Sequence, residues 1–188
     1  VTIGGKVSPA GGNFEEPVTQ ATLKVVGAFH GLSRERSDAR KYPAIHPIDS
    51  WSKYRGVVDM ERVEQARAIL KRSSEINQMM KVIGEEGTSA EDYIVYQKGE
   101  LLDAVYLQQN SFDPIDAACD PARQLHEFNV LYDVLTREFA LSDKKEIRAF
   151  FNQVRQEFLD WHNTVFQTPE FEAQERKLKD FYLSRAAE

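Results

Sequence analysis

The chain has 188 residues, with 24 Lys and Arg against 30 Asp and Glu, and a formal net charge of −6 with neutral histidines. This charge argues against a nucleic-acid partner, because phosphate recognition needs a dense cationic face and the charges here are interspersed. No apolar run approaches the ~20 residues that cross a bilayer, so we expect no direct membrane insertion and a cytoplasmic location. The single cysteine, Cys119, excludes an internal disulfide framework.

Turn-forming residues divide the sequence into two regions. Most glycines and prolines precede Ser50, whereas the remainder has long stretches of helical periodicity. We therefore expect two domains, residues 1–50 and residues 51–188, with the boundary between Asp49 and Gly56. Because the first residue is not methionine and lies within an apolar pattern, we also expect the sequence to be cut from a longer polypeptide.

The first region predicts short strands. The runs Val1–Val7 and Thr22–Phe29 are β-branched and apolar, and the second is apolar enough to be buried.

The second region predicts five helices. Apolar residues spaced three, four and six apart mark the first helix, which Gly84 should end. Residues that favour helix N-termini precede each apolar stripe, and two of them are followed directly by proline, which fits the first helical turn. The five expected starts are Asp59, Ser89, Asp120, Ser142 and Thr168. The result is an antiparallel bundle with short loops.

Few residues suggest independent chemistry. The phosphate-binding pattern G-x-x-x-x-G-K-[ST] is absent from the sequence. The four histidines, His30, His46, His126 and His162, lie at no metal-ligand spacing, and we predict no metal site. We interpret Cys119 as a buried, inert thiol in preference to a nucleophile.

Three segments resemble the catalytic A subunits of vacuolar and archaeal-type rotary ATPases. Residues 8–20, S-P-A-G-G-N-F-E-E-P-V-T-Q, resemble the family's S-P-P-G-G-D-F-S-E-P-V-T-Q. Residues 40–46, R-K-Y-P-A-I-H, resemble R-R-H-F-P-A-I-N, and residues 108–112, Q-Q-N-S-F, match Q-Q-N-A-F. These segments occur in family order and, with the helices, cover essentially the whole chain.

Some positions depart from the A-subunit pattern. Asn13 and Glu15 replace the usual Asp and Ser, and residues 42–50 resemble the beta subunit of F-type ATPases more closely. Gly11-Gly12 and the run at 108–112 favour the A subunit, and the glycine pair disfavours the flagellar-export relatives. The A- and beta-subunit families share one architecture, so the expected fold is the same.

The resemblance implies a mainly α fold, in which an antiparallel helical bundle follows a short β-containing tail of the α/β nucleotide-binding domain. It implies a parent subunit that hydrolyses or makes ATP with Mg²⁺, coupled to proton or sodium transport in a peripheral membrane complex. Its partners would be the alternating B subunits of the catalytic hexamer and the central-stalk subunits. Because this fragment has no phosphate-binding loop, we expect it to be inactive alone and to bind no nucleotide tightly.

The resemblance also assigns site residues. Tyr42 and Phe112 match adenine-contacting aromatic positions, although the residues alone favour a core role, and we expect them to converge in an apolar slot. In the acidic loop, Glu86, Glu91 and Asp92 are expected to contact the rotor; ordinary solubilising charge is the alternative. The alternative function is an independent helical protein-interaction module.

Overall fold

The computed structural model describes residues 1–187, except for the side chain of Ala10. These residues form seven α-helices and one small antiparallel sheet. The helices are α1 (Pro17–Val25), α2 (Arg34–Asp38), α3 (Met60–Ile83), α4 (Ala90–Leu102), α5 (Pro121–Thr136), α6 (Lys144–His162) and α7 (Pro169–Leu183); the strands are β1 (Ala28–Phe29) and β2 (Trp51–Ser52). Short 3₁₀ and π segments, η1 (Ala10–Gly12) and η2 (Asp103–Leu107), complete the elements. The predicted mainly helical class is confirmed.

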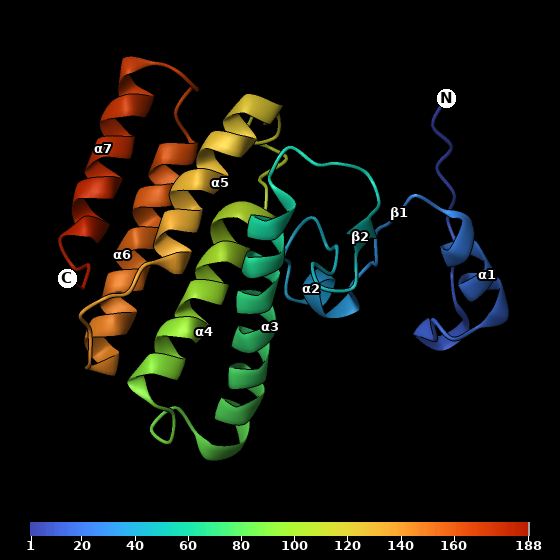
Figure 1. Cartoon of the computed structure of the whole chain (residues 1–188), viewed down its shortest axis with the longest axis horizontal. Helices are drawn as coiled ribbons and strands as arrows, with labels where there is room; N and C mark the ends of the chain where they lie inside the picture. The colour runs from blue at the N-terminus through green and yellow to red at the C-terminus, as the bar shows by residue number, and fades with distance from the viewer. Residues whose placement is uncertain (188) are drawn as a thin grey trace.

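The helices α3 to α7 stand side by side as a bundle, and α2 and the small sheet lie against its α3 side (Figure 1). The sheet pairs Ala28 with Ser52 and Phe29 with Trp51. Helix α1 lies beyond the sheet, apart from the bundle (Figure 1). An edge-to-face contact between the rings of Phe14 and Phe29, with centroids 5.8 Å apart, joins the start of the chain to the sheet.

Side-chain caps explain where the helices begin. Three predicted caps are confirmed: the side chains of Ser89, Asp120 and Thr168 each accept a backbone N–H of the following turn. Asp59, where the helical region was expected to begin, caps α3 in the same way. Helix α6 begins one residue later than expected, because the carboxylate of Asp143 rather than the hydroxyl of Ser142 caps it, accepting from the amide of Glu146 at 3.0 Å. Gly84 ends α3 as predicted, with a φ of 78° that favours glycine.

The two predicted strands are largely wrong. Residues 1–7 form no regular element, because the part of the chain that the structure describes offers them no neighbouring strand and β-propensity depends on such pairing. Of the second run, Thr22–Val25 lies in α1, where Pro17 opens the helix and local propensity is overridden. Only Ala28 and Phe29 are in a strand.

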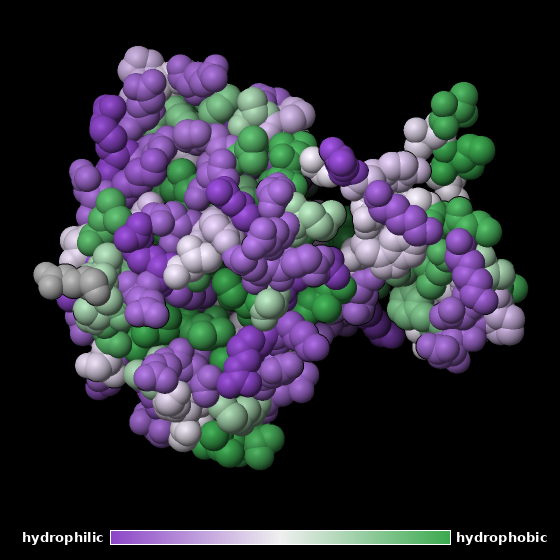
Figure 2. All heavy atoms as spheres, viewed as in Figure 1, coloured by the Kyte–Doolittle hydropathy of each residue, from purple (hydrophilic) through white to green (hydrophobic). Residues whose placement is uncertain are grey.

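The hydrophobic core lies within the bundle. Its largest fully buried side chains include Trp161, Phe158, Tyr93, Leu131 and Leu178, contributed by α4, α5, α6 and α7. By contrast, several apolar residues in the first 25 positions are exposed, among them Val1, Ile3, Val18 and Val25. Figure 2 shows hydrophobic residues at this end of the molecule, and patches of them also lie among the hydrophilic residues on the face of the bundle. No helix among the described residues is long and apolar enough to cross a membrane.

Candidate functional site

The two aromatic segments identified in the sequence lie next to each other. The amide of Gln109 donates a hydrogen bond to the carbonyl of Tyr42 at 3.0 Å, although the residues are far apart in the chain. The Tyr42 segment is in turn held to its own region, because the amide of Lys41 donates to the carbonyl of Arg36 at 2.8 Å. One main-chain hydrogen bond, from Gln109 to Tyr42, therefore joins the two segments.

The aromatic rings of these segments are open to solvent. The side chain of Tyr42 is half exposed, and Phe112 has a relative exposed area of 96%. The two segments therefore meet at Gln109 and Tyr42, but the described residues do not enclose the ring of Phe112 in a slot. Their role toward adenine stays a prediction.

Phe112 is carried by a loop with its own hydrogen bonds. The carboxylate of Asp116 accepts from the amide of Asn110 at 2.5 Å, and the Asn110 side chain accepts from the amide of Phe112 at 3.1 Å. The carbonyl of Asp116 also accepts from the side chain of Gln109 at 3.3 Å. The loop is therefore a closed turn that begins beside Tyr42 and presents Phe112 at its exposed end.

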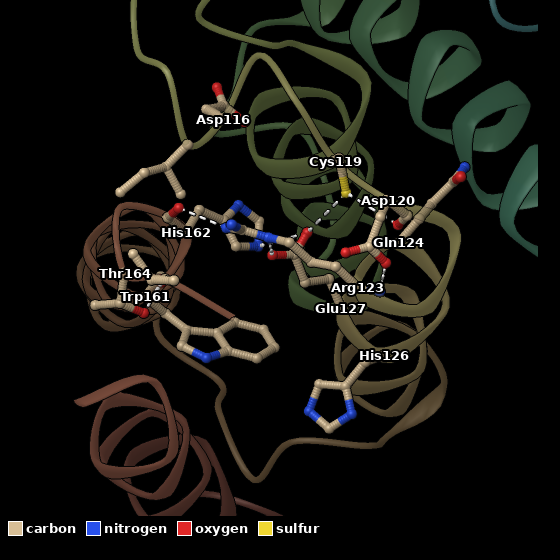
Figure 3. A network of polar contacts seen from close by, with 12 residues as sticks. Asp116, Cys119, Asp120, Arg123, Gln124, His126, Glu127, Trp161, His162 and Thr164 are labelled. Carbon is tan, nitrogen blue, oxygen red and sulfur yellow. Dashed lines mark hydrogen bonds and ion pairs between the residues drawn. The ribbon is translucent and has the colours of Figure 1, made fainter. Parts of the chain in front are cut away.

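A buried polar network lies beyond this loop, between α5 and the end of α6 (Figure 3). The guanidinium of Arg123 donates to the carboxylate of Glu127 at 2.6 Å and to the carbonyl of His162 at 2.6 Å. The thiol of Cys119 contacts the same carboxylate at 3.9 Å. The network fastens the start of α5, and so the end of the Phe112 loop, to α6.

Protonation states in this network do not favour catalysis. Burial, with the Glu127 charge, raises the pKa of the Cys119 thiol to about 11, so the thiol stays protonated at neutral pH. Burial, with the Arg123 charge, lowers the pKa of His162 to about 4, so its ring is neutral. These pKa shifts support the prediction that the Cys119 thiol is inert, although Cys119 is half-buried rather than fully buried. Within residues 1–187, no group of three His, Cys, Asp or Glu side chains is placed to hold a metal ion.

A second buried charge cluster was missed in the sequence. The carboxylate of Asp103 accepts from Arg36 at 2.5 Å and from Lys41 at 2.6 Å, so it joins α2 and the Tyr42 segment to the bundle. The available signal was a single acidic residue inside the apolar run L-L-D-A-V, where a burial penalty requires a cationic partner. Sequence alone could not identify that partner, because Arg36 lies 67 positions away.

The acidic loop between α3 and α4 is attached to α6. Arg148 pairs with Glu85, and the ammonium of Lys144 donates to the carbonyls of Glu85 and Glu86 at 2.6 and 3.1 Å. Asp92 is engaged within the hairpin by Arg72 at 2.8 Å.

The end of the α3–α4 hairpin nevertheless presents unengaged surface. Glu86 and Glu91 are exposed, and so are the apolar side chains of Val82 and Ile83 at the end of α3. The exposed surface of this tip is therefore partly apolar as well as acidic. Its contact with a rotor remains a prediction.

The helical bundle and the small strand-containing segment before it define a mainly helical protein. Residues 60–151 match the family model described as the C-terminal domain of V and A type ATP synthase.

Relatives match over nearly the whole chain. The V-type ATP synthase alpha chain of Borrelia turicatae is 60% identical over 185 residues, which is 98% of this chain and 32% of the relative. That of Treponema denticola is 58% identical over 186 residues, 99% of this chain and 32% of the relative. The chain therefore belongs to the family of V-type ATP synthase alpha chains, of which it is a C-terminal region. It spans about a third of the length of these relatives.

Proposed function

We propose that the chain is the C-terminal part of the catalytic A subunit of a V/A-type ATPase that translocates protons or sodium ions. In this role it supplies the adenine side of the nucleotide site, through Tyr42 and Phe112, and transmits nucleotide-dependent motion to the central stalk. The parent subunit binds ATP or ADP with Mg²⁺, through a phosphate-binding loop that lies outside this sequence, and acts with the B subunits of the hexamer.

The observation that carries the adenine proposal is the hydrogen bond from the Gln109 amide to the Tyr42 carbonyl. It brings together the two segments whose aromatic residues match adenine-contacting positions. Adenine is flat and largely apolar, so it binds by stacking on aromatic faces, whereas its phosphates need cationic and backbone donors. Two exposed rings on adjoining segments suit the first task, and the exposed area of Phe112 leaves its faces free for a ligand.

The proposed coupling role rests on the α3–α4 hairpin. Its tip combines exposed carboxylates, Glu86 and Glu91, with exposed Val82 and Ile83, a composition suited to contact with another subunit. The contacts of Lys144 and Arg148 with the loop join the tip to α6. A displacement of the bundle would therefore move the tip with it, which is the requirement for pushing a central stalk.

The adenine proposal is tested in the full-length alpha chain assembled in its complex. We expect Tyr42→Ala and Phe112→Ala each to raise the KM for ATP more than they lower kcat, because adenine contacts are equally strong in the ground and transition states. Stacking contributes about 1 kcal/mol, so each rise should be about fivefold. Tyr54→Ala is the matched control, since Tyr54 is an exposed tyrosine outside both segments. Unchanged KM values in both test variants would contradict the proposal.

A further inference from the structure

Asp103 occupies an unusual position in the fold. It follows the last residue of α4 and opens the π segment η2, and its side chain is buried. π segments insert an extra residue into a helix and often occur at functional sites. After η2 the backbone turns extended at Gln108, with φ −102° and ψ 143°, and leads into the loop that carries Phe112.

The carboxylate of Asp103 holds the segment that ends at Tyr42. One oxygen accepts from Arg36 at 2.5 Å and the other from Lys41 at 2.6 Å. The Arg36 side chain is nine-tenths buried, and among residues 1–187 its Nε and Nη2 atoms have no hydrogen-bond partner. The ammonium of Lys41 lies 3.9 Å from one further carboxylate, that of Glu100, whose side chain is half exposed. Asp103 is therefore the principal anion for both cations, and Lys41 immediately precedes Tyr42.

The backbone of Asp103 holds the second segment. Its carbonyl accepts from the side chain of Gln108 at 3.2 Å, and the next residue, Gln109, donates its amide to Tyr42. One residue thus connects to both segments, through its side chain to residues 36–41 and through its carbonyl to Gln108.

We propose that Asp103 is a positioning residue for the adenine side of the nucleotide site. The proposal rests on the function proposed above, and it assigns Asp103 no contact with the nucleotide. Neutralising the carboxylate weakens its hold on Arg36 and Lys41, so the Tyr42 segment loosens from the Gln108 segment. The two rings are then presented less often in the geometry that stacks on one adenine, and nucleotide binding weakens without a change in the chemical step.

The first test measures positioning in this chain without nucleotide. Amide hydrogen exchange should be about tenfold faster at Gln109 in Asp103→Asn, because the hydrogen bond to Tyr42 opens more often. Amides in the middle of α6, such as Val154, should keep their protection, which separates local loosening from unfolding. Glu100→Gln is the matched control, since it removes a carboxylate near Lys41 from the last turn of α4 without removing a buried hydrogen bond.

If Asp103→Asn does not fold, Lys41→Ala replaces it. That variant removes the direct link to the Tyr42 segment from a partly exposed position and leaves the bond between Arg36 and Asp103 intact. It should also accelerate exchange at Gln109. Unchanged exchange at Gln109 in a folded Asp103→Asn or Lys41→Ala variant would overturn the proposal.

The second test measures the KM and kcat for ATP in the assembled complex. Asp103→Asn should raise the KM by about threefold to tenfold with kcat nearly constant, as Tyr42→Ala does, while Glu100→Gln leaves both unchanged. A rise in Tyr42→Ala together with none in Asp103→Asn would reject the positioning role alone. If Tyr42→Ala and Phe112→Ala both leave the KM for ATP unchanged, the proposed adenine function fails. The exchange measurement still decides whether Asp103 positions the two segments.

Discussion

The packing of α3 on α4 leaves no room for a side chain at Gly99. A Cβ atom built at this position would lie 2.3 Å from both the Cβ and the Oγ of Ser73, whereas ordinary contacts between such atoms begin near 3.4 Å. Gly99→Ala must therefore push the two helices of the hairpin apart by about 1 Å. The hydroxyl of Ser73 also donates to the carbonyl of Tyr96 at 3.1 Å, and this hydrogen bond would be strained by the same movement.

The expected change in the free energy of unfolding is the balance of two destabilising contributions and one stabilising contribution. Overpacking costs about 1–3 kcal/mol, and loss of the hydrogen bond costs about 1 kcal/mol. Replacing glycine within a helix returns about 1 kcal/mol. We therefore expect Gly99→Ala to lower the free energy of unfolding by about 2 kcal/mol.

Urea denaturation of the chain, followed by far-UV circular dichroism, measures this change. Gly56→Ala serves as the control, because a Cβ there meets no atom closer than 3.9 Å. In the double variant Gly99→Ala with Ser73→Gly, the clash disappears, so the cost should be smaller than the sum of the two single changes. Equal stability of Gly99→Ala and the unsubstituted chain would refute the close packing of α3 on α4.

Three further predictions concern activity, the loop and pH. The purified chain should show no Mg²⁺-dependent ATP hydrolysis in a phosphate-release assay, because it has no lysine and hydroxyl of a phosphate-binding loop to stabilise the transferred phosphoryl; turnover that persists across preparations would contradict this. The triple change of Glu86, Glu91 and Asp92 to alanine should shift the thermal midpoint by less than about 3 °C, because exposed ion pairs contribute little; an unfolded variant would make the loop structural. Stability should fall as the pH is lowered from 6.5 to about 4, because His162 is neutral when buried and the unfolded chain takes up the proton first. His162→Gln should remove this part of the pH dependence, worth at most about 3 kcal/mol by urea denaturation, and an unchanged profile would show that His162 is not buried neutral.

Local signals were sufficient to predict most of the bundle. Capping residues and apolar stripes act within one or two turns, so Asp59, Ser89, Asp120 and Thr168 located four of the five helix starts in the bundle. The strands failed for the opposite reason. A run such as Val1–Val7 needs a neighbouring strand for its backbone, and the described residues provide none.

The candidate site, too, could be predicted only where its signals are local in the sequence. Tyr42 and Phe112 could be selected from short motifs, because each motif is contiguous in the sequence. Their proximity depends on the hydrogen bond from Gln109 to Tyr42, and the position of that segment depends on the pairing of Asp103 with Arg36 and Lys41. These contacts bridge more than 60 positions, and no periodicity or spacing in a single sequence encodes such a pairing.

The most direct test of the central claim locates the adenine ring. The assembled alpha chain would be photolabelled with an ATP analogue that carries an azide on adenine, and the labelled peptides would be identified by mass spectrometry. Unmodified ATP in excess serves as the competitor. We expect competitor-sensitive labelling at Tyr42 or Phe112, in the peptides covering residues 40–46 and 108–113. Specific labelling confined to other parts of the subunit would contradict it.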